Sequence, residues 1–484
     1  MHNQEEKQMS GYHEILSSAR AWLYAHKDEM ISDLRDFVRI RSVSRADQAA
    51  EGAPFGEELR QMLNYALSKG GKYGFKTYNG DGYYGKIMMG DDDNSIGMIA
   101  HLDVVPEGVN WIYPPYEGAV EGDFMFGRGV SDNKGSAIAC LYAMRMVKEM
   151  NLPVKHGLRL ILGCSEETGM QDMDAYNARE KASVVTLVPD AAFPVCYAQK
   201  GSLTAHAEIA LGADILSFDG GEVDNMVPPV AKCLLNKEYD EVLKAFEAHN
   251  LISDQIEITK AGDKPCVTAH GVASHAASPE NGVSAIHLLA GAILESGLVS
   301  GQSEKALSAI RFISQGFYGE HAGIGCEDED TGKTTMVIGI ARTHENVVEI
   351  HADCRLSIKA DPDMNKKVMT QAMENAGFAV TYMETTGPVY IPKDHPMVLA
   401  LMNAYREITG DEALAYTMGG GTYSRCLENA ITFGLGMRTV SARPENLPQG
   451  HGGAHAPDEY QYLPALFEST LVFLSSVLKL DEIV

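Results

Sequence analysis

The chain has 484 residues, 45% of them hydrophobic, which is enough for two or three globular domains with cores of their own. Its formal charge of −26 at pH 7 argues against nucleic acid and anionic membrane surfaces as partners, because both require a basic footprint. The same acidic balance is expected of a chain whose carboxylates hold cations. We therefore expect a globular protein that binds neither nucleic acid nor a membrane.

The apolar runs and the cysteines bear on the cellular compartment. No apolar run approaches the roughly 18 residues that span a bilayer, and the polar residues Met1 to Lys7 have no apolar signal core behind them. The eight cysteines lie far apart and include no Cys-x-x-Cys pair of a zinc ribbon or redox motif. These patterns predict a cytoplasmic protein without a membrane-spanning segment.

The first predicted element is an amphipathic helix near the start of the chain. Its apolar residues recur at helical spacing, and they are Met30, Ile31, Leu34, Phe37 and Val38. An acidic turn at 91–94 then leads into the apolar run 96–105, which we predict to be a buried strand.

The run 96–105 carries His101 and Asp103 near its end. Because side chains alternate between the two faces of a strand, these two residues point the same way from its carboxyl end. A histidine oriented by a nearby carboxylate is a common metal ligand. The alternative is a buried histidine with satisfied hydrogen bonds, followed by an aspartate that begins a turn.

Asp132 stands at the entrance to the next predicted helix. A loop rich in glycine and charge, 118–129, precedes it, and a long apolar helix is predicted over 136–150. An aspartate in this position can cap the helix N-terminus, and that is the structural alternative to a functional role.

Two further apolar runs, 157–164 and 183–189, are predicted to be buried strands. The first leads directly to Glu166 and Glu167, and the second ends on Asp190. Strands that alternate with helices imply a mostly parallel sheet, and such sheets bind ligands outside the carboxyl ends of their strands. We therefore expect His101 and these carboxylates to converge at one edge of an α/β domain.

The pattern of apolar and polar residues changes from about residue 200. Several runs alternate apolar and polar residues as half-exposed antiparallel strands do, and they are 202–211, 256–260, 265–270, 334–341 and 347–359. Helix and glycine-rich loop patterns resume after about residue 386. We therefore predict a first domain, 1–199 and 387–484, that is interrupted by an inserted α+β domain with an antiparallel sheet, 200–386.

The last hundred residues contain a second histidine of interest. The glycine-rich segment 418–425 offers backbone amides with little side-chain obstruction. His455 follows in another glycine-rich loop, ahead of an apolar helix predicted over 462–478. A lone histidine of this kind has a structural role, but as a fifth ligand it would complete a set.

The assembled set has the chemistry of a two-metal site. Two histidines and three carboxylates suit a pair of divalent ions with one carboxylate shared between them. Such a bridge holds two ions roughly 3.5–4 Å apart, so that together they bind one water and polarise one carbonyl. One glutamate of the pair 166–167 is then left to act as a general base, and the site is equipped for hydrolysis.

This set resembles the two-metal peptidases that include aminoacylase, carnosinase and bacterial dipeptidases of the PepV type. The match runs in order through nearly the whole chain, over His101-x-Asp103, the segment 127–135 around Asp132, Glu166-Glu167, Asp190, and His455-x-x-Asp458-Glu459. Each motif is weak alone, but five in the same order are specific.

The resemblance implies a role for each of these residues. Asp132 would bridge the ions, His101 and Asp190 would complete one site, and Glu167 and His455 would complete the other. Glu166 would be the general base, and Asp103 would orient His101. Members of the family also have a cis peptide bond after the bridging aspartate, which here would join residues 132 and 133.

The inserted domain resembles the lid of this family. The segment 271–279 contains His275, which would stabilise the oxyanion of the scissile carbonyl. Asn225 and Arg355 match residues that bind the substrate, including its terminal carboxylate, which the planar fork of an arginine can grip with two bonds. Without the resemblance, Arg355 would be read as a surface charge and Asn225 as a turn residue.

The resemblance implies a metal-dependent dipeptidase that hydrolyses its substrate through a metal-bridged water activated by Glu166. The cofactors would be two divalent ions, zinc first, with manganese or cobalt also accepted. The insertion is longer than the domain through which many relatives dimerise, which favours a monomer acting on small peptides with free termini. An N-acyl-amino-acid amidohydrolase or desuccinylase of the same family is the alternative.

Two readings from other classes fit less well. A dinucleotide oxidoreductase requires Gly-x-Gly-x-x-Gly after its first strand, whereas Gly127-Arg128-Gly129 continues to Asp132. A non-catalytic binding protein on the same scaffold should have lost a ligand or the base, and all six positions are filled here.

Overall fold

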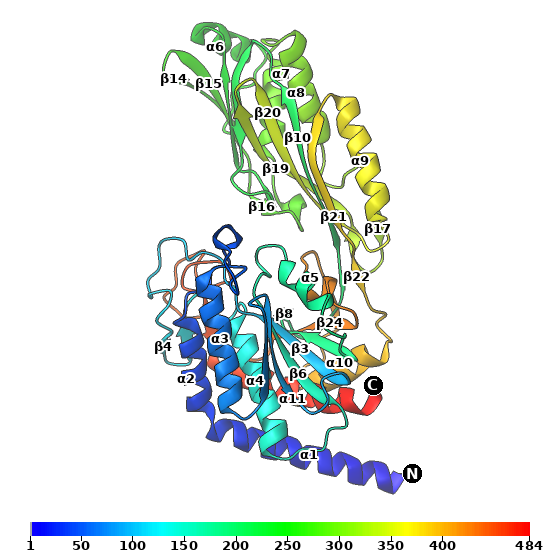
Figure 1. Ribbon diagram of the computed structural model, residues 1–484. Coiled ribbons are helices and arrows are strands. Elements are labelled where there is room, and N and C mark those ends of the chain that lie inside the picture. The colour runs from blue at the N-terminus through cyan, green and yellow to red at the C-terminus, as the bar shows by residue number, and fades with distance from the viewer. Residues whose placement is uncertain (1) are drawn as a thin grey trace. The chain divides into compact units, whose positions relative to one another are not determined.

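The computed structural model describes the backbone of residues 2–484 and the side chains of residues 11–484. The chain forms two compact units (Figure 1). The first contains Met1–Tyr197, Ile391–Tyr416 and Thr422–Val484, and the second contains Ala198–Tyr390 and Thr417–Gly421. The chain passes between them near the predicted boundaries at 199/200 and 386/387. The short segment 417–421, which the prediction placed in the first domain, belongs to the second unit.

The centre of the first unit is a mixed sheet whose strands follow the order β1-β2-β6-β3-β7-β24-β9. In this order their bounds are Lys76–Gly80, Tyr84–Met89, Gly157–Gly163, Ser95–His101, Val185–Val188, Ala430–Phe433 and Val195–Gln199. The inner strands β6, β3, β7 and β24 run parallel, whereas the outer strands pair antiparallel. The predicted α/β fold is confirmed, with a sheet that is parallel only at its centre.

Helices cover both faces of this sheet. Tyr84 of β2 packs with Met173 and Tyr176 of α5, whereas the neighbouring Gly85 faces Leu63 of α3, and adjacent residues of a strand point to opposite faces. Strands β3 and β6 are buried along their whole length, as parallel strands between helical layers are. The helices of this unit are α1 His2–Ala25, α2 Lys27–Val38, α3 Glu57–Lys72, α4 Lys134–Glu149, α5 Gln171–Asn177, α10 Pro396–Thr409 and α11 Leu463–Ile483.

Helix α11 differs from the expectation that no run of the chain could span a membrane. Its 21 residues are long and apolar enough to do so by length and composition alone. However, 83% of its apolar window is buried inside the structure, and the helix packs against α4, α10 and β3. Its apolar character is therefore explained by its place in the core of the unit.

Short elements complete the first unit. Strands β4 Ala119–Glu121, β5 Phe124–Phe126 and β26 Tyr460–Tyr462 form a small antiparallel sheet, and β8 Ala191–Ala192 pairs with β25 Leu435–Gly436. The 3₁₀ turns are η1 Ala46–Gln48 and η3 Tyr423–Arg425. Strands β22 Val389–Tyr390 and β23 Tyr416–Met418 lie where the chain passes between the units.

The second unit is built on an antiparallel sheet with the strand order β14-β15-β13-β11-β19-β20-β10-β21. In this order the strands span Ile256–Ala261, Lys264–His270, Val230–Leu235, Ile215–Gly220, Thr335–His344, Val347–Leu356, Gly201–Ala210 and Ala379–Thr386. Along β10 buried and half-buried residues alternate strictly, which is the pattern that predicted half-exposed strands here. The predicted α+β insertion with an antiparallel sheet is confirmed.

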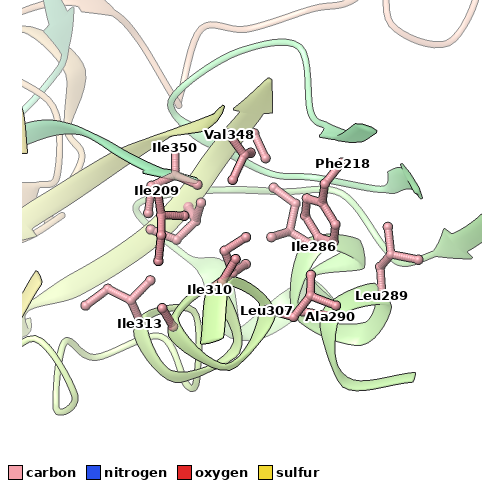
Figure 2. Close-up of a cluster of buried hydrophobic side chains, with 14 of the residues drawn as sticks. Ile209, Phe218, Ile286, Leu289, Ala290, Leu307, Ile310, Ile313, Val348 and Ile350 are labelled. Atoms are coloured by element: carbon pink, nitrogen blue, oxygen red, sulfur yellow. The ribbon is translucent and has the colours of Figure 1, made fainter. Parts of the chain in front are cut away.

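Helices cover one face of this second sheet. Figure 2 shows Ile209 and Ile350 of the sheet packed with Ile286 of α7 and Ile310 of α8. The helices of the unit are α6 Tyr239–Ala248, α7 Ala285–Glu295, α8 Gly301–Ile313 and α9 Pro362–Ala376, with the 3₁₀ turn η2 Pro279–Asn281. Two small two-stranded antiparallel sheets pair β12 Met226–Val227 with β16 Ser274–His275, and β17 Glu327–Asp328 with β18 Gly332–Lys333.

Candidate metal centre

The carboxyl ends of three neighbouring parallel strands carry four of the residues predicted for the site, namely three ligands and the general base. His101 is the last residue of β3, Glu166 and Glu167 follow β6, and Asp190 follows β7. Since β6, β3 and β7 are adjacent and parallel, their carboxyl ends meet at one edge of the sheet, where ligands bind in such folds. The sequence reasoning predicted this convergence.

Asp132 lies two residues before α4 and does not cap that helix. The N-cap residue is Asn133, and its side chain makes no capping hydrogen bond. The bond between Asp132 and Asn133 is cis, as the resemblance implied. The two carboxylate oxygens of Asp132 point instead at two histidines: Oδ1 lies 3.1 Å from His101 Nε2, and Oδ2 lies 3.2 Å from His455 Nε2.

Each of these histidines has a second carboxylate partner. The Nε2 atom of His101 lies 3.7 Å from Asp190 Oδ1, and that of His455 lies 3.1 Å from Glu167 Oε1. The donor atoms of His101, Glu166 and Asp190 also lie within 4.8 Å of one another. Asp132 is thus shared between two groups of donors, one at His101 and one at His455.

The spacing of the donor atoms fits divalent ions. Ligands that bind one tetrahedral ion at about 2.0–2.2 Å lie roughly 3.3–3.6 Å from each other, and the imidazole–carboxylate distances here run from 3.1 to 3.7 Å. The donors are imidazole nitrogens and carboxylate oxygens, which suit zinc, manganese or cobalt. The residues present therefore fit two divalent ions that share Asp132.

The negative charge of the carboxylates in this site also favours the binding of positive charge. Burial acts to lower the pKa of His101, but hydrogen bonds with Asp103, Asp132 and Asp190 raise it well above its usual value. Hydrogen bonds with Asp132 and Glu167 raise the pKa of His455 to about 10. Without bound ions, protons on the two imidazoles balance the carboxylates, so that metal ions and protons compete for the same nitrogens.

This competition predicts that metal binding is coupled to pH. The raised pKa values of both histidines favour their protonated forms in the ion-free protein, so zinc binding should release protons, and the affinity should rise with pH by up to about tenfold per unit for each proton displaced. Calorimetric titration of chelator-stripped protein with zinc, repeated in buffers of different ionisation enthalpy, measures the number released. Binding that releases no proton between pH 6 and 8 would contradict the assignment.

Asp103 connects the histidine to the glutamate pair. The side chain is fully buried, and its oxygens accept hydrogen bonds from the backbone N–H groups of Glu166 at 3.2 Å and Glu167 at 3.0 Å. His101 Nδ1 donates to the backbone carbonyl of Asp103 at 2.9 Å and lies 3.4 Å from its carboxylate. Asp103 thus fixes the ring so that Nε2 faces the centre, and it also holds the turn that carries the glutamates.

Two further buried carboxylates support the same loops and were not assigned roles from the sequence. Glu459 accepts hydrogen bonds from the backbone of Gly129, Ser131 and Asp132. Asp172 accepts from the backbone N–H groups of Cys164 and Ser165, which directly precede the glutamate pair. Asp172 lies in the first turn of α5, and an aspartate there has no sequence pattern that marks a supporting role. Its role is visible only in the structure.

The predicted substrate residues lie in the second unit. His275 belongs to β16, whose partner strand β12 begins just after Asn225, and the N–H of Ala276 donates to the carbonyl of Asn225 at 2.9 Å. The guanidinium of Arg355 makes two bonds, of 2.7 and 2.8 Å, to the carboxylate of Asp353. With only 14% of its side chain exposed, Arg355 is not a free surface charge.

The ring of His275 is neutral and has a defined tautomer. Burial and the positive charge of Arg355 lower its pKa below the usual value. Its Nδ1 accepts a hydrogen bond from the N–H of Ala277 at 3.1 Å, so the ring proton lies on Nε2. A neutral ring with a free Nε2–H is a hydrogen-bond donor for a carbonyl oxygen or an oxyanion.

Comparisons with known proteins cover the same residues. The model of "Peptidase family M20/M25/M40" matches residues 97–479. "Putative dipeptidase YtjP" of Bacillus subtilis (strain 168) is 31% identical over 471 residues, which are 94% of this chain and 98% of that protein. "Putative dipeptidase" of Staphylococcus epidermidis (strain ATCC 12228 / FDA PCI 1200) is 28% identical over 467 residues, 93% and 97% of the two chains.

Solved structures share the fold at low identity. Human carnosine dipeptidase 1 aligns over 97% of this chain and 99% of its own with a TM-score of 0.55 and 14% identity. The M20 family metallo-carboxypeptidase Sso-CP2 of Sulfolobus solfataricus aligns over 94% and 100% with a TM-score of 0.56 and 16% identity. The family match spans the strands, loops and helices that carry every donor of the metal centre, and the chain belongs to peptidase family M20/M25/M40, a family of metallopeptidases.

Proposed function

We propose that the protein is a two-metal dipeptidase. The observation that carries the proposal is the carboxylate of Asp132, whose two oxygens each face one histidine, with Asp190 beside His101 and Glu167 beside His455. His101 and Asp190 would hold one ion, His455 and Glu167 the other, and Asp132 both. Two full-length relatives carry the name dipeptidase, which supports the substrate class.

In the proposed reaction the ions would polarise the substrate and the water, and Glu166 would transfer the proton. Two divalent ions held here, zinc first and manganese or cobalt as substitutes, supply Lewis-acid polarisation of a carbonyl and make water easier to deprotonate. Glu166 would take the proton from the attacking water and deliver it to the leaving amine. In the ion-free protein, burial and the charge of Asp190 raise the pKa of Glu166 well above its usual value.

The second unit would bind the substrate. His275 has its proton on Nε2 and would donate to the carbonyl oxygen as negative charge develops there. Arg355 and Asn225 would hold the terminal carboxylate, with Asp353 keeping the guanidinium in position. By resemblance to the family, a lid that closed over both ends of a short peptide would exclude longer chains, so we propose dipeptides with free termini, hydrolysed by a cytoplasmic monomer.

A substrate panel tests this function. Chelator-stripped protein, reloaded with zinc, manganese or cobalt, would be assayed on dipeptides, tripeptides and N-acyl amino acids by release of free amine. We expect hydrolysis of dipeptides, dependent on added metal, with little activity on the other two classes. Preference for N-acetyl or N-succinyl amino acids would instead show an amidohydrolase or desuccinylase with the same metal centre.

Arg355→Ala is expected to raise KM for dipeptides and to leave the metal content unchanged. Losing a charge-assisted pair costs roughly 1.5–3 kcal/mol, which corresponds to about 10- to 150-fold in affinity. Asn225→Ala should act in the same direction with a smaller effect. Steady-state kinetics and elemental analysis of the same preparations measure both quantities.

The controls separate a lost contact from a damaged fold. Arg355→Lys keeps the charge but loses the planar fork, so it should recover only part of the affinity. Arg311→Ala removes an arginine of the same unit that pairs with Glu295 on the surface, and it should behave as wild type. Unchanged kinetics for Arg355→Ala and Asn225→Ala would remove the carboxylate-binding assignment.

A further inference from the structure

A second cluster of metal-binding side chains lies in the second unit, on the face of the sheet that α7, α8 and α9 do not cover. His206 of β10 stands directly opposite His351 of β20 in the antiparallel register. Both belong to the half-buried set that alternates with the core residues of these strands. The two rings stack with centroids 3.8 Å apart and an interplanar angle of 6°.

Two carboxylates adjoin this pair of rings. Asp224, in the loop between β11 and β12, has its Oδ1 atom 2.8 Å from His351 Nδ1. Glu349 has its Oε1 atom 3.5 Å from His351 Nε2 and 3.9 Å from His206 Nδ1. One donor atom from each of His206, Asp224 and His351 lies within 4.8 Å of the other two. Three separate segments of the chain thus contribute donors to one place.

We propose that His206, His351 and Asp224 bind a divalent transition-metal ion, with Glu349 beside it, in addition to the ions of the metal centre. Two imidazoles and carboxylate oxygens are the ligand set that zinc, cobalt and nickel accept. The stacked rings must turn apart to direct both nitrogens at one ion. Side-chain exposures of 28% for His206 and 19% for His351 leave room for that rotation.

The charges around the pair are consistent with a bound cation. Asp224 lies 2.8 Å and Glu349 3.5 Å from nitrogens of His351, so the two carboxylates supply negative charge that an ion would balance. The ion would tie the loop that carries Asn225 to strands β10 and β20, because Asp224 directly precedes Asn225.

Metal stoichiometry tests this site. Tag-free protein would be stripped with chelator, dialysed against excess zinc, passed over a desalting column and analysed by plasma mass spectrometry. We expect wild type to keep one zinc ion more per chain than His206→Ala, His351→Ala or the conservative Asp224→Asn. The matched control is His344→Ala, an exposed histidine 3.7 Å from Glu349 but outside the three-residue group, which should keep the wild-type number.

The proposed site of His206, His351 and Asp224 can also be tested in a variant whose metal centre is disrupted. Glu167→Ala combined with His455→Ala removes ligands of the metal centre only, so this variant should still lose one further ion when His351→Ala is added. Cobalt loading gives a second readout. Visible absorption from the cobalt ion proposed at His206, His351 and Asp224 should remain in the variant that carries Glu167→Ala and His455→Ala. Equal zinc content in wild type, His206→Ala and His351→Ala, with all three folded by circular dichroism, would overturn the proposal.

Discussion

Glu166→Ala is expected to keep the metal content of wild type and to lose at least the 10²–10⁴-fold in kcat that a general base typically contributes. Glu166 shares its turn with Glu167, yet the imidazole contacts at His455 are made by Glu167 and Asp132. Removing Glu166 therefore takes away a proton acceptor and leaves every histidine–carboxylate pair in place. Dipeptide turnover and elemental analysis on one preparation test both parts of the prediction.

Glu167→Ala is the matched comparison, because the two side chains differ by one position on the same turn. It removes a carboxylate 3.1 Å from His455 Nε2, so it should lower the occupancy of one metal site and lose activity as a consequence. Excess metal in the assay should rescue part of the activity of Glu167→Ala but none of that of Glu166→Ala. Loss of metal from Glu166→Ala and not from Glu167→Ala would reverse the two assignments.

His275→Ala is expected to reduce kcat by about 10²–10³-fold, because a donor to a developing oxyanion acts mainly in the transition state. Metal content and stability should stay near wild type, since His275 is an exposed residue of the short two-stranded sheet of β12 and β16. The control is His270→Ala, an exposed histidine at the end of β15. If His275→Ala lost metal in elemental analysis, His275 would be a ligand and its role would be different.

Much of the candidate metal centre could be read from the sequence because several of its side chains follow strand ends. A buried parallel strand is a continuous apolar run, and a single ionisable residue at its end is easy to recognise. His101, Glu166 and Asp190 were found in this way. The order β6-β3-β7 could not be read directly, yet alternating strands and helices were enough to place the three ends at one edge.

The antiparallel edges of the sheet were not predicted. Strand β9 is buried along its whole length and β2 over its first four residues, much like the parallel strands beside them, so composition alone does not reveal their direction. The last helix was predicted over 462–478, whereas α11 continues to Ile483. Leu480 and the charged Asp481 in this extension are both buried.

Supporting residues were missed for a different physical reason. Glu459 accepts a hydrogen bond from the backbone N–H of Asp132, which lies 327 residues earlier in the chain. Asp172 accepts one from Ser165, only 7 residues earlier, but no local pattern marks a carboxylate that will accept such bonds. The pair His206 and His351 likewise depends on the register of β10 against β20. A shift of one residue would place the rings on opposite faces of the sheet, so only the structure brings them together.

The central claim, a metal-dependent dipeptidase, is tested most directly by hydrolysis of Ala-Ala and N-acetyl-alanine with chelator-stripped protein before and after addition of zinc, manganese or cobalt. We expect no turnover in the stripped protein, recovery of Ala-Ala hydrolysis on addition of metal, and little hydrolysis of N-acetyl-alanine throughout. Full activity on Ala-Ala in protein verified to be free of metal, or recovery confined to N-acetyl-alanine, would contradict the account.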